Sequence, residues 1–452
     1  MNERELRAAI SAVGAGAMSR RQFIDRLVGL GLTGPMAAGL LSHAGVASAQ
    51  SAPAYKPTRR GGGGLLRLLF WQGPTLLNPH FASGSKDQEG SRPFLEPLIR
   101  FDADGEPRAV LAAEVPSRAN GGLAADGKSV IWKLRPGVQW HDGKPFGADD
   151  VVFNWQYATD PAAAAWTVGQ YDNVKAVEKI DALTVRTVFE KPMPNWPQHG
   201  NVQLLPKHLF DAYRGAKARE APNNLKPVGT GPYRFVEFKP GDLVRGELNP
   251  NYHGPNRPHF DSFELKGGGD AISAARTVLQ TGEYDFAWNL LVEDEVLKRM
   301  ESGGKGRVVF TPGGDTEYIR LAVADPWVET DGERAHPKSR HPILRDKAVR
   351  QALLQLTDRR AIQQYVYGRG GVATANVLNN PARFNSPNGS LEASVDKANA
   401  LLDAAGWKRG ADGIREKDGR KLRFVYQSSI NAVRQKVQQI VKQSCGKAGI
   451  DV

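Results

Sequence analysis

The chain has 452 residues, of which 40% are hydrophobic and 8% aromatic, so it can bury the cores of two or three globular domains. Its 60 Lys and Arg against 48 Asp and Glu give a formal net charge of +12. These cations are mixed with acids along the chain and form no basic stripe, which argues against nucleic-acid binding. The single cysteine, Cys445, excludes an internal disulfide and a cysteine-based metal site.

Residues 1–49 have the pattern of a signal peptide. Twin arginines come first, then a mildly apolar run over 27–41, then a small-x-small cleavage site at 47–49. The signal residues are Arg20, Arg21, Ala47 and Ala49. The pattern predicts export, by the twin-arginine route in preference to the Sec route, although Ile24-Asp25 replaces the usual Leu-Lys. Residues 50–64, which end in four glycines, are expected to be a flexible leader.

Beyond Leu65 the sequence predicts a mixture of strands and helices. Apolar runs and alternation predict strands at 65–70, 130–135, 185–189 and 233–238. Apolar residues at helical spacing predict helices at 149–157, 395–405 and 431–444. Ser394 can cap the second helix and Gly406 can end it. This mixture, without strict βαβ regularity, indicates an α/β protein with more than one lobe.

The sequence contains no complete catalytic motif. Ser-x-x-Lys occurs at Ser83 and again at Ser394, but the partner motifs of penicillin-binding proteins are missing. Gly229-Thr230-Gly231-Pro232 lacks the Gly-Lys-Ser/Thr of a phosphate loop and is expected to be a turn. His253 and His259 are flanked by Pro and Asn, which favours a surface loop over a metal site. We therefore expect no enzymatic activity, no cofactor and no metal.

A set of motifs in fixed order resembles the family-5 extracellular solute-binding proteins, which include oligopeptide-, dipeptide- and nickel-binding proteins. The longest signature is LAADGKSVIWKLRPGVQWHDG over 123–143. The other matching segments are 77–80, 96–101, 144–151, 228–233, 249–252, 282–285, 345–353 and 404–407. Together these motifs are far more specific than any one of them, and they cover nearly all of the chain after the leader.

The resemblance implies a two-lobed periplasmic-binding-protein fold of class II type with an extra small domain. The first lobe would comprise 65–95 and 194–284, the extra domain 96–193, and the second lobe 285–452. In the family, ligand closes the lobes by hinge motion, and the chain returns to the first lobe at its end. Because the sequence stops at a strand-like start, 449–452, we expect the second lobe to be incomplete, with part of the ligand pocket beyond Val452.

The resemblance also implies ligand contacts. Ser83, Gly84 and Ser85 align with a segment whose extended backbone can pair with a peptide like an added strand. Trp288 and Asn289 align with a second contact, where Trp288 would offer a flat apolar wall. For each residue the alternative is a packing or turn role. Ser83 stands where some peptide-binding members have an acidic residue, so their ligand preference does not transfer.

The predicted function is the substrate-binding component of an ABC importer, which captures peptides or peptide-like solutes in the periplasm. Its partners would be the solute and a membrane complex of permease and ATPase, and the protein would be a monomer. Within the same class, the ligand could instead be a nickel chelate, haem, a sugar or an opine. Of other classes, a ligand-presenting sensor accessory and an exported hydrolase stay open.

Overall fold

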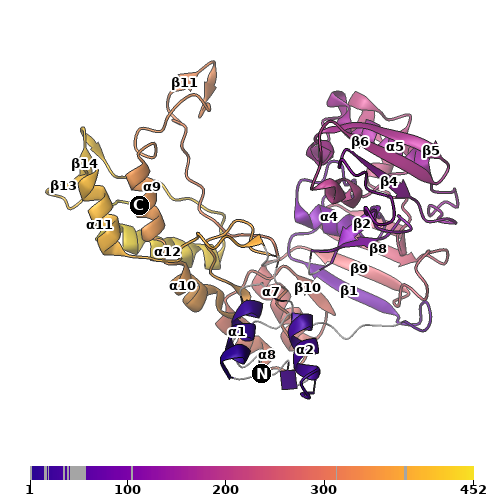
Figure 1. Cartoon of the computed structure of the whole chain (residues 1–452), viewed down its shortest axis with the longest axis horizontal. Coiled ribbons are helices and arrows are strands. Elements are labelled where there is room, and N and C mark those ends of the chain that lie inside the picture. Colours follow the sequence, from indigo (N-terminus) through magenta and orange to yellow (C-terminus); the bar gives the residue numbers. More distant parts are fainter. Residues whose placement is uncertain are drawn as a thin grey trace. The chain divides into compact units, whose positions relative to one another are not determined.

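The computed structural model describes residues 3–14, 18, 20–33, 36–37, 40, 57–102, 105–311, 313–380 and 384–452. The chain forms two compact units. The sheet unit comprises Gln50–Leu290 with Gly303–Arg307, and the helical unit comprises Met1–Ala49, Leu291–Ser302 and Val308–Val452. Figure 1 labels their elements.

The sheet unit is built on a five-stranded sheet of order β10-β1-β9-β8-β7. Its strands are β1 Leu65–Phe70, β7 Tyr233–Lys239, β8 Leu243–Leu248, β9 Ser262–Gly267 and β10 Phe286–Trp288. β1 runs parallel to both β9 and β10, whereas β8 is antiparallel to both β9 and β7. The carboxyl ends of β1 and β10 therefore reach the same edge of the sheet (Figure 1).

One core of the sheet unit packs against this sheet. Helices α4 Ser85–Ser91, α5 Ala148–Thr159, α6 Lys207–Phe210 and α7 Ala271–Arg276 belong to this unit. Phe94, Tyr157 and Phe263 are fully buried in the core, and α5 contributes Tyr157 because its apolar residues recur at helical spacing. Short helical segments complete the unit: η1 Pro161–Ala163, η2 Trp166–Tyr171, η3 Trp196–Asn201, η4 Gly215–Glu220, η5 Pro222–Asn224 and η6 Thr277–Thr281.

A second core of the sheet unit lies around a smaller antiparallel sheet of order β4-β6-β5. These strands are β4 Ser129–Lys133, β5 Val174–Asp181 and β6 Thr184–Phe189, and a separate pair comprises β2 Ile99–Phe101 and β3 Pro107–Ala109. Ile99, Trp132 and Val185 are buried in this core. Trp155 on α5 packs against both cores, so this helix joins them.

The helical unit packs its helices around a third core. They are α8 Asp294–Glu301, α9 Lys347–Gln355, α10 Arg359–Ile362, η7 Gln363–Tyr367, η8 Gly368–Gly370, α11 Val395–Ala404 and α12 Ala432–Lys447. Its short strands are β11 Glu329–Thr330, β12 Glu333–Arg334, β13 Lys408–Arg409, β14 Arg415–Lys417 and β15 Arg420–Lys421. Val349, Leu402 and Val441 are buried together, and so is Cys445. Burial raises the pKa of the Cys445 thiol to about 11, which makes it a packing residue.

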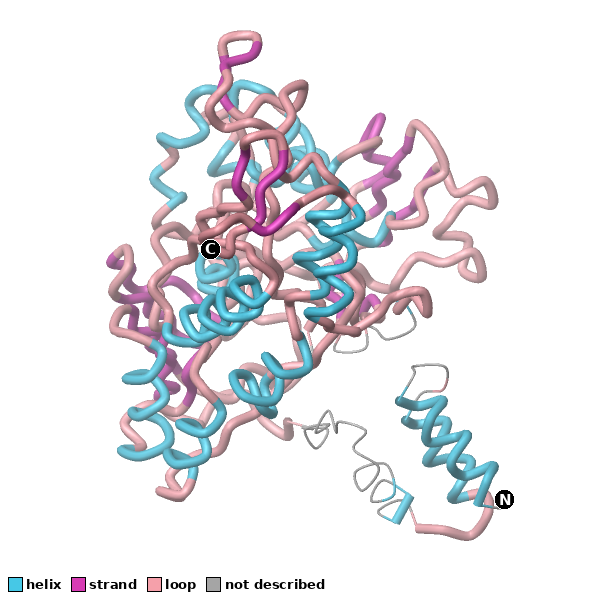
Figure 2. Tube along the Cα trace, turned by 90° about the vertical axis from the view of Figure 1, so that its left-hand side faces the viewer, coloured by secondary structure: helices cyan, strands magenta, loops and turns pink. Residues whose placement is uncertain are grey.

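The helices α1 Glu3–Gly14 and α2 Arg20–Val28 lie side by side near the N-terminus (Figure 2). Ala9, Val13, Phe23 and Leu27 are buried in one hydrophobic cluster. Among the helices of the described residues, none is both long enough and apolar enough to cross a membrane.

The predicted elements agree with the structure to within a few residues. Ser394 caps α11 by accepting a hydrogen bond from the Lys397 amide at 3.1 Å. Two details differ from the expected ranges. Residues 286–288 pair with β1, so the sheet unit continues past the expected boundary at 285 to Leu290. At the end of the expected flexible leader, the amides of Gly62 and Gly64 donate to Asp261 at 2.7 and 2.8 Å, which fixes this stretch to the sheet unit.

Candidate functional site

The edge formed by the carboxyl ends of β1 and β10 carries two of the predicted contact residues. Phe70 is opposite Trp288 in the register, so both side chains lie on one face, and their rings stack at 4.8 Å with an interplanar angle of 19°. Trp288 is half-buried. Asn289 is exposed, has φ 54°, and accepts a hydrogen bond from Trp71 Nε1 at its carbonyl, 2.9 Å away. The edge thus presents an aromatic pair whose position is fixed by strand pairing.

The other predicted contact segment follows β1 in the chain and leads into α4. Ser83 and Ser85 are exposed and Gly84 is half-buried, with an extended backbone at φ −108° and ψ 143°. The Gly84 carbonyl accepts from the amides of Asp87 and Gln88 at 3.0 and 3.2 Å. Because that carbonyl is used by α4, a peptide pairing here would have to use other backbone groups of the segment.

Asp87 holds this segment in place. Its buried carboxylate accepts hydrogen bonds from the Thr75 and Leu76 amides at 2.6 and 3.2 Å and from Lys86 Nζ at 2.8 Å. Lys86 Nζ also donates to Thr75 Oγ1 at 2.7 Å. Lys86 is therefore committed to Asp87 and Thr75, and the Ser-x-x-Lys at Ser83 does not form a nucleophile–base pair.

The Asn-Pro-His motif is a buried polar network. The two ring nitrogens of His80 lie 2.6 Å from Thr167 Oγ1 and 3.0 Å from Asn154 Oδ1, and Asn78 Nδ2 donates to Asn224 Oδ1 at 2.7 Å. Burial lowers the pKa of His80 to about 4, although the hydrogen bond with Asn154 opposes the shift. A neutral, fully enclosed imidazole anchors the loop between β1 and α4 to α5.

Sequence reasoning missed a buried carboxylate, Glu96. It accepts hydrogen bonds from Thr230 Oγ1 at 3.0 Å, Tyr252 Oη at 2.9 Å and His253 Nε2 at 2.8 Å. His253 does lie in a loop, but its ring packs inward to pair with Glu96, whereas His259 is exposed. The signal lay in the motifs at 96–101, 228–233 and 249–252, which contain Glu96, Thr230 and Tyr252, and His253 comes directly after the last of them. No cluster of three metal-ligating side chains occurs among the described residues.

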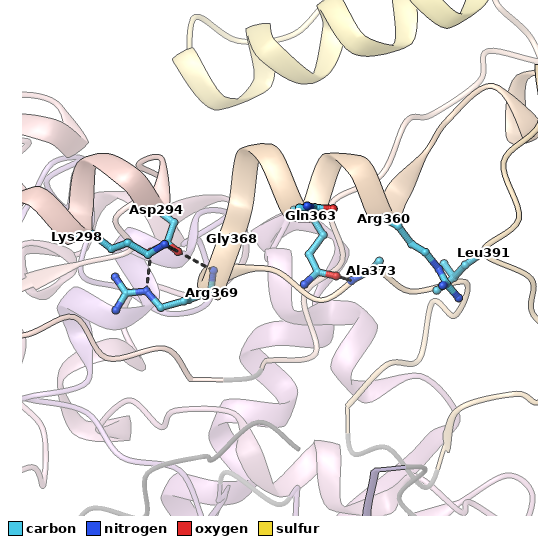
Figure 3. Close-up of a pocket in the computed structure, with 9 residues that line it drawn as sticks. Asp294, Lys298, Arg360, Gln363, Gly368, Arg369, Ala373 and Leu391 are labelled. Atoms are coloured by element: carbon cyan, nitrogen blue, oxygen red, sulfur yellow. Dashed lines mark hydrogen bonds and ion pairs between the residues drawn. The ribbon is translucent and has the colours of Figure 1, made fainter. Parts of the chain in front are cut away.

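The helical unit contains an open pocket of about 740 Å³, which the sequence did not predict (Figure 3). It is lined by Asp294, Lys298, Arg360, Gln363, Gln364, Gly368, Arg369, Ala373 and Leu391. Arg369 donates to Asp294 through Nε at 2.7 Å and through its backbone amide at 3.0 Å. Burial alone would raise the pKa of Asp294, but these bonds from Arg369 outweigh it and lower that pKa.

The charged side chains around this pocket differ in whether they have an ion-pair partner. Arg369 also pairs with Glu301 at 2.9 Å, and Lys298 pairs with Glu295 at 2.6 Å. Within the described part of the chain, the Arg360 guanidinium has no ion-pair partner. These three cations and the three carboxylates of Asp294, Glu295 and Glu301 balance, so the Arg360 guanidinium is the group here that could accept an acidic group, with Gln363 and Gln364 as neutral hydrogen-bonding neighbours.

Comparisons with known proteins all identify solute-binding proteins as relatives of this chain. Residues 110–452 match the family described as bacterial extracellular solute-binding proteins, family 5 Middle. The chain is 30% identical over 389 residues to the oligopeptide-binding protein AppA of Bacillus subtilis, covering 84% of this chain and 66% of AppA. It is 28% identical over 391 residues to the glutathione-binding protein GsiB of Pectobacterium atrosepticum, with the same coverage of 84% and 66%. The chain thus spans about 66% of the length of these curated relatives.

Solved structures are similar too. The structure of Bacillus subtilis AppA with a nonapeptide superposes with a TM-score of 0.66 at 28% identity, covering 88% of this chain and 74% of that one. The structure of NikZ from Campylobacter jejuni with Ni(L-His) gives a TM-score of 0.68 at 24% identity, covering 86% and 72%. These likenesses confirm the expected two-lobed periplasmic-binding-protein fold.

Proposed function

Because the chain belongs to the family-5 bacterial extracellular solute-binding proteins, we propose that it is the substrate-binding component of an ABC importer. It captures peptides or peptide-like solutes in the periplasm and delivers them to a membrane permease and its ATPase. Members of this family are extracellular or periplasmic transport binding proteins and not enzymes. A hydrolase with Ser83 as nucleophile is disfavoured as well, because Lys86, its candidate base, is hydrogen-bonded to Thr75 and Asp87.

One observation carries the choice of a peptide-like ligand. The Phe70–Trp288 stack lies at the carboxyl end of β1, and Gly84, whose backbone is extended, follows that strand in the chain just before α4. An aromatic wall tolerates many side chains, and an extended backbone can pair with a peptide main chain of any sequence. We propose that Ser83, Gly84, Ser85, Trp288 and Asn289 contact the ligand. The relatives named for oligopeptides and glutathione support a solute with peptide bonds.

We further propose that the protein is exported by the twin-arginine route and acts as a monomer in the periplasm. Arg20 and Arg21 begin α2, while Ala47 and Ala49 lie outside the described residues. This proposal rests on the order of twin arginines, apolar run and small-x-small site in the sequence.

A thermal-shift screen tests the ligand class. The panel contains di- to nonapeptides, glutathione, nickel–histidine, haem, sugars and opines, and a ligand that binds only the folded state raises the melting temperature. We expect stabilisation by peptides or glutathione. Stabilisation by another class alone would replace the peptide assignment but keep the transport role. A permease gene adjacent to this one would separate transport from a sensor accessory.

A further inference from the structure

The second core of the sheet unit contains a small cavity of about 20 Å³ with a mainly apolar lining. It is lined by Leu98, Trp132, Val151, Trp155, Tyr171, Val177, Thr187, His199 and Leu204. A space of this size holds one water molecule, provided that the walls offer two or more polar partners. A water in this cavity would therefore need polar atoms of the lining that have no other hydrogen-bond partner.

Two of the lining residues each carry a buried polar atom without a hydrogen-bond partner in the described part of the chain. They are the Trp155 Nε1 donor and His199 Nε2. A buried polar group that makes no hydrogen bond costs about 1–3 kcal/mol, so two such groups around one cavity need an explanation. Because both residues line the same 20 Å³ space, a single molecule can contact both.

The hydrogen bond on the other side of the His199 ring fixes its tautomer. His199 Nδ1 contacts the Gln170 carbonyl, which can only accept, so Nδ1 carries the proton. Burial lowers the pKa of His199, although the Gln170 bond opposes this, so the ring is neutral at neutral pH. His199 Nε2 is then an acceptor, and Trp155 Nε1 is a donor.

A third polar group completes the site. Trp132 Nε1 donates to Thr187 Oγ1 at 3.2 Å, so the Thr187 hydroxyl has its own proton left to donate. A water in the cavity can accept from Trp155 Nε1 and Thr187 Oγ1 and donate to His199 Nε2. Three hydrogen bonds are typical of a buried water.

We propose that this cavity is a binding site for one structural water, which joins α5, β6 and η3 through Trp155, Thr187 and His199. Trp155 packs against both cores of the sheet unit, so the water lies beside the helix that joins them. This water site does not depend on which solute the protein binds. The water would satisfy the polar groups that the packing of the second core leaves without partners.

A crystal structure of the protein at high resolution is the direct test. We expect density for one ordered water within hydrogen-bonding distance of Trp155 Nε1 and His199 Nε2. A direct bond between these two nitrogens, or a cavity without density, would overturn the proposal.

A solution measurement complements the crystal. Water-oxygen relaxation dispersion counts long-lived internal waters, and Val177→Ile adds one methyl group that fills the cavity. We expect Val177→Ile to lose one long-lived water and to shift the His199 Nε2 nitrogen resonance. The matched control is Val236→Ile on the exposed face of β7, which should change neither. An unchanged water count in a folded Val177→Ile protein would contradict the site.

If Val177→Ile does not fold, a measurement on the wild-type protein tests the proposal by itself. Its Trp155 indole proton should show magnetisation transfer from a long-lived water. Absence of that transfer, with an assigned indole resonance, would equally overturn the proposal.

Discussion

Trp288 contacts Phe70 on one face and belongs to the proposed ligand wall on the other. Replacing it by Ala should weaken binding of a stabilising ligand by about 1–3 kcal/mol, a loss typical of an aromatic anchor. Because Trp288 is half-buried and stacks on Phe70 at 4.8 Å, some stability will also be lost. Isothermal titration at a temperature where the variant is fully folded separates the two effects.

Trp166 is the matched control for this prediction, since it is 64% exposed and lies in the same unit on η2. Trp166→Ala should leave affinity unchanged. Equal affinities of the Trp288→Ala variant and the parent would assign Trp288 to packing, and the proposed ligand wall would have to lie elsewhere.

His80 makes stability depend on pH. Its folded-state pKa of about 4 lies below the ordinary value of 6.5, so the unfolded chain binds the extra proton first. Stability from this group is therefore complete above pH 6.5 and is lost as the pH falls toward 4. At 1.4 kcal/mol per pH unit, the loss between pH 7.5 and pH 5 is about 2 kcal/mol. His141, with a pKa also lowered to about 4 by burial, adds to the effect in the same window.

Urea unfolding at pH 5 and pH 7.5 measures this dependence. His80→Gln should be less stable than the parent at pH 7.5 but should lose about 2 kcal/mol less on acidification. Val236→Ala, at an exposed position without a titratable group, serves as the control and should keep the parent slope. If His80→Gln and the parent have the same slope, His80 is protonated in the folded protein and our account of the network fails.

At the scale of elements, the Gly-Thr-Gly-Pro turn before β7 packs closely on the segment before β2. A Cβ at Gly229 would lie 1.8 Å from the Phe94 carbonyl oxygen, a clash with backbone that no side-chain rotation can relieve. Gly229→Ala should therefore destabilise the protein by about 3 kcal/mol, as overpacking of a rigid site does. Thermal unfolding checks it.

Gly169→Ala provides the comparison, because a Cβ at Gly169 meets nothing within 4 Å. That change should alter stability by less than about 1 kcal/mol. A Gly229→Ala protein as stable as the Gly169→Ala protein would show that residues 229–231 can move away from Phe94.

The elements that the sequence predicted are those with local causes. The apolar run of β1, the Ser394 cap of α11 and the periodicity of α12 need no distant partner. The missed features depend on residues far apart in the chain: Glu96 meets His253 across 157 positions, and β1 pairs with β10. The 740 Å³ pocket likewise combines Asp294, Arg360 and Leu391. Single-sequence periodicity contains no information on such pairings.

For the candidate site, resemblance contributed what periodicity could not. It singled out Trp288 and Ser83–Ser85, and the structure places Trp288 at the end of β10 and Ser83–Ser85 at the start of α4. Strand pairing explains why Trp288 meets Phe70. Their contact with ligand stays a prediction, because it depends on the solute and on binding measurements.

At the scale of the whole molecule, two compact units and a family match over 110–452 are consistent with a binding protein that works outside the cytoplasm. We propose that export is encoded in the sequence before the sheet unit. The twin arginines Arg20 and Arg21 open α2, and the small-x-small site follows at 47–49. We expect cleavage after Ala49, so that Gln50 is the first residue of the exported protein.

Mass spectrometry of the periplasmic fraction tests both cleavage and route. The exported protein should begin at Gln50, and replacing Arg20 and Arg21 together by Lys should retain the uncleaved protein in the cytoplasm, because twin-arginine recognition requires the arginine pair. Arg26→Lys, in the same helix, keeps the positive charge and the pair and should be exported normally. Normal export of the double-Lys protein would assign it to the Sec route, since that route needs only positive charge before the apolar run. An exported protein that retains Met1 would contradict cleavage itself.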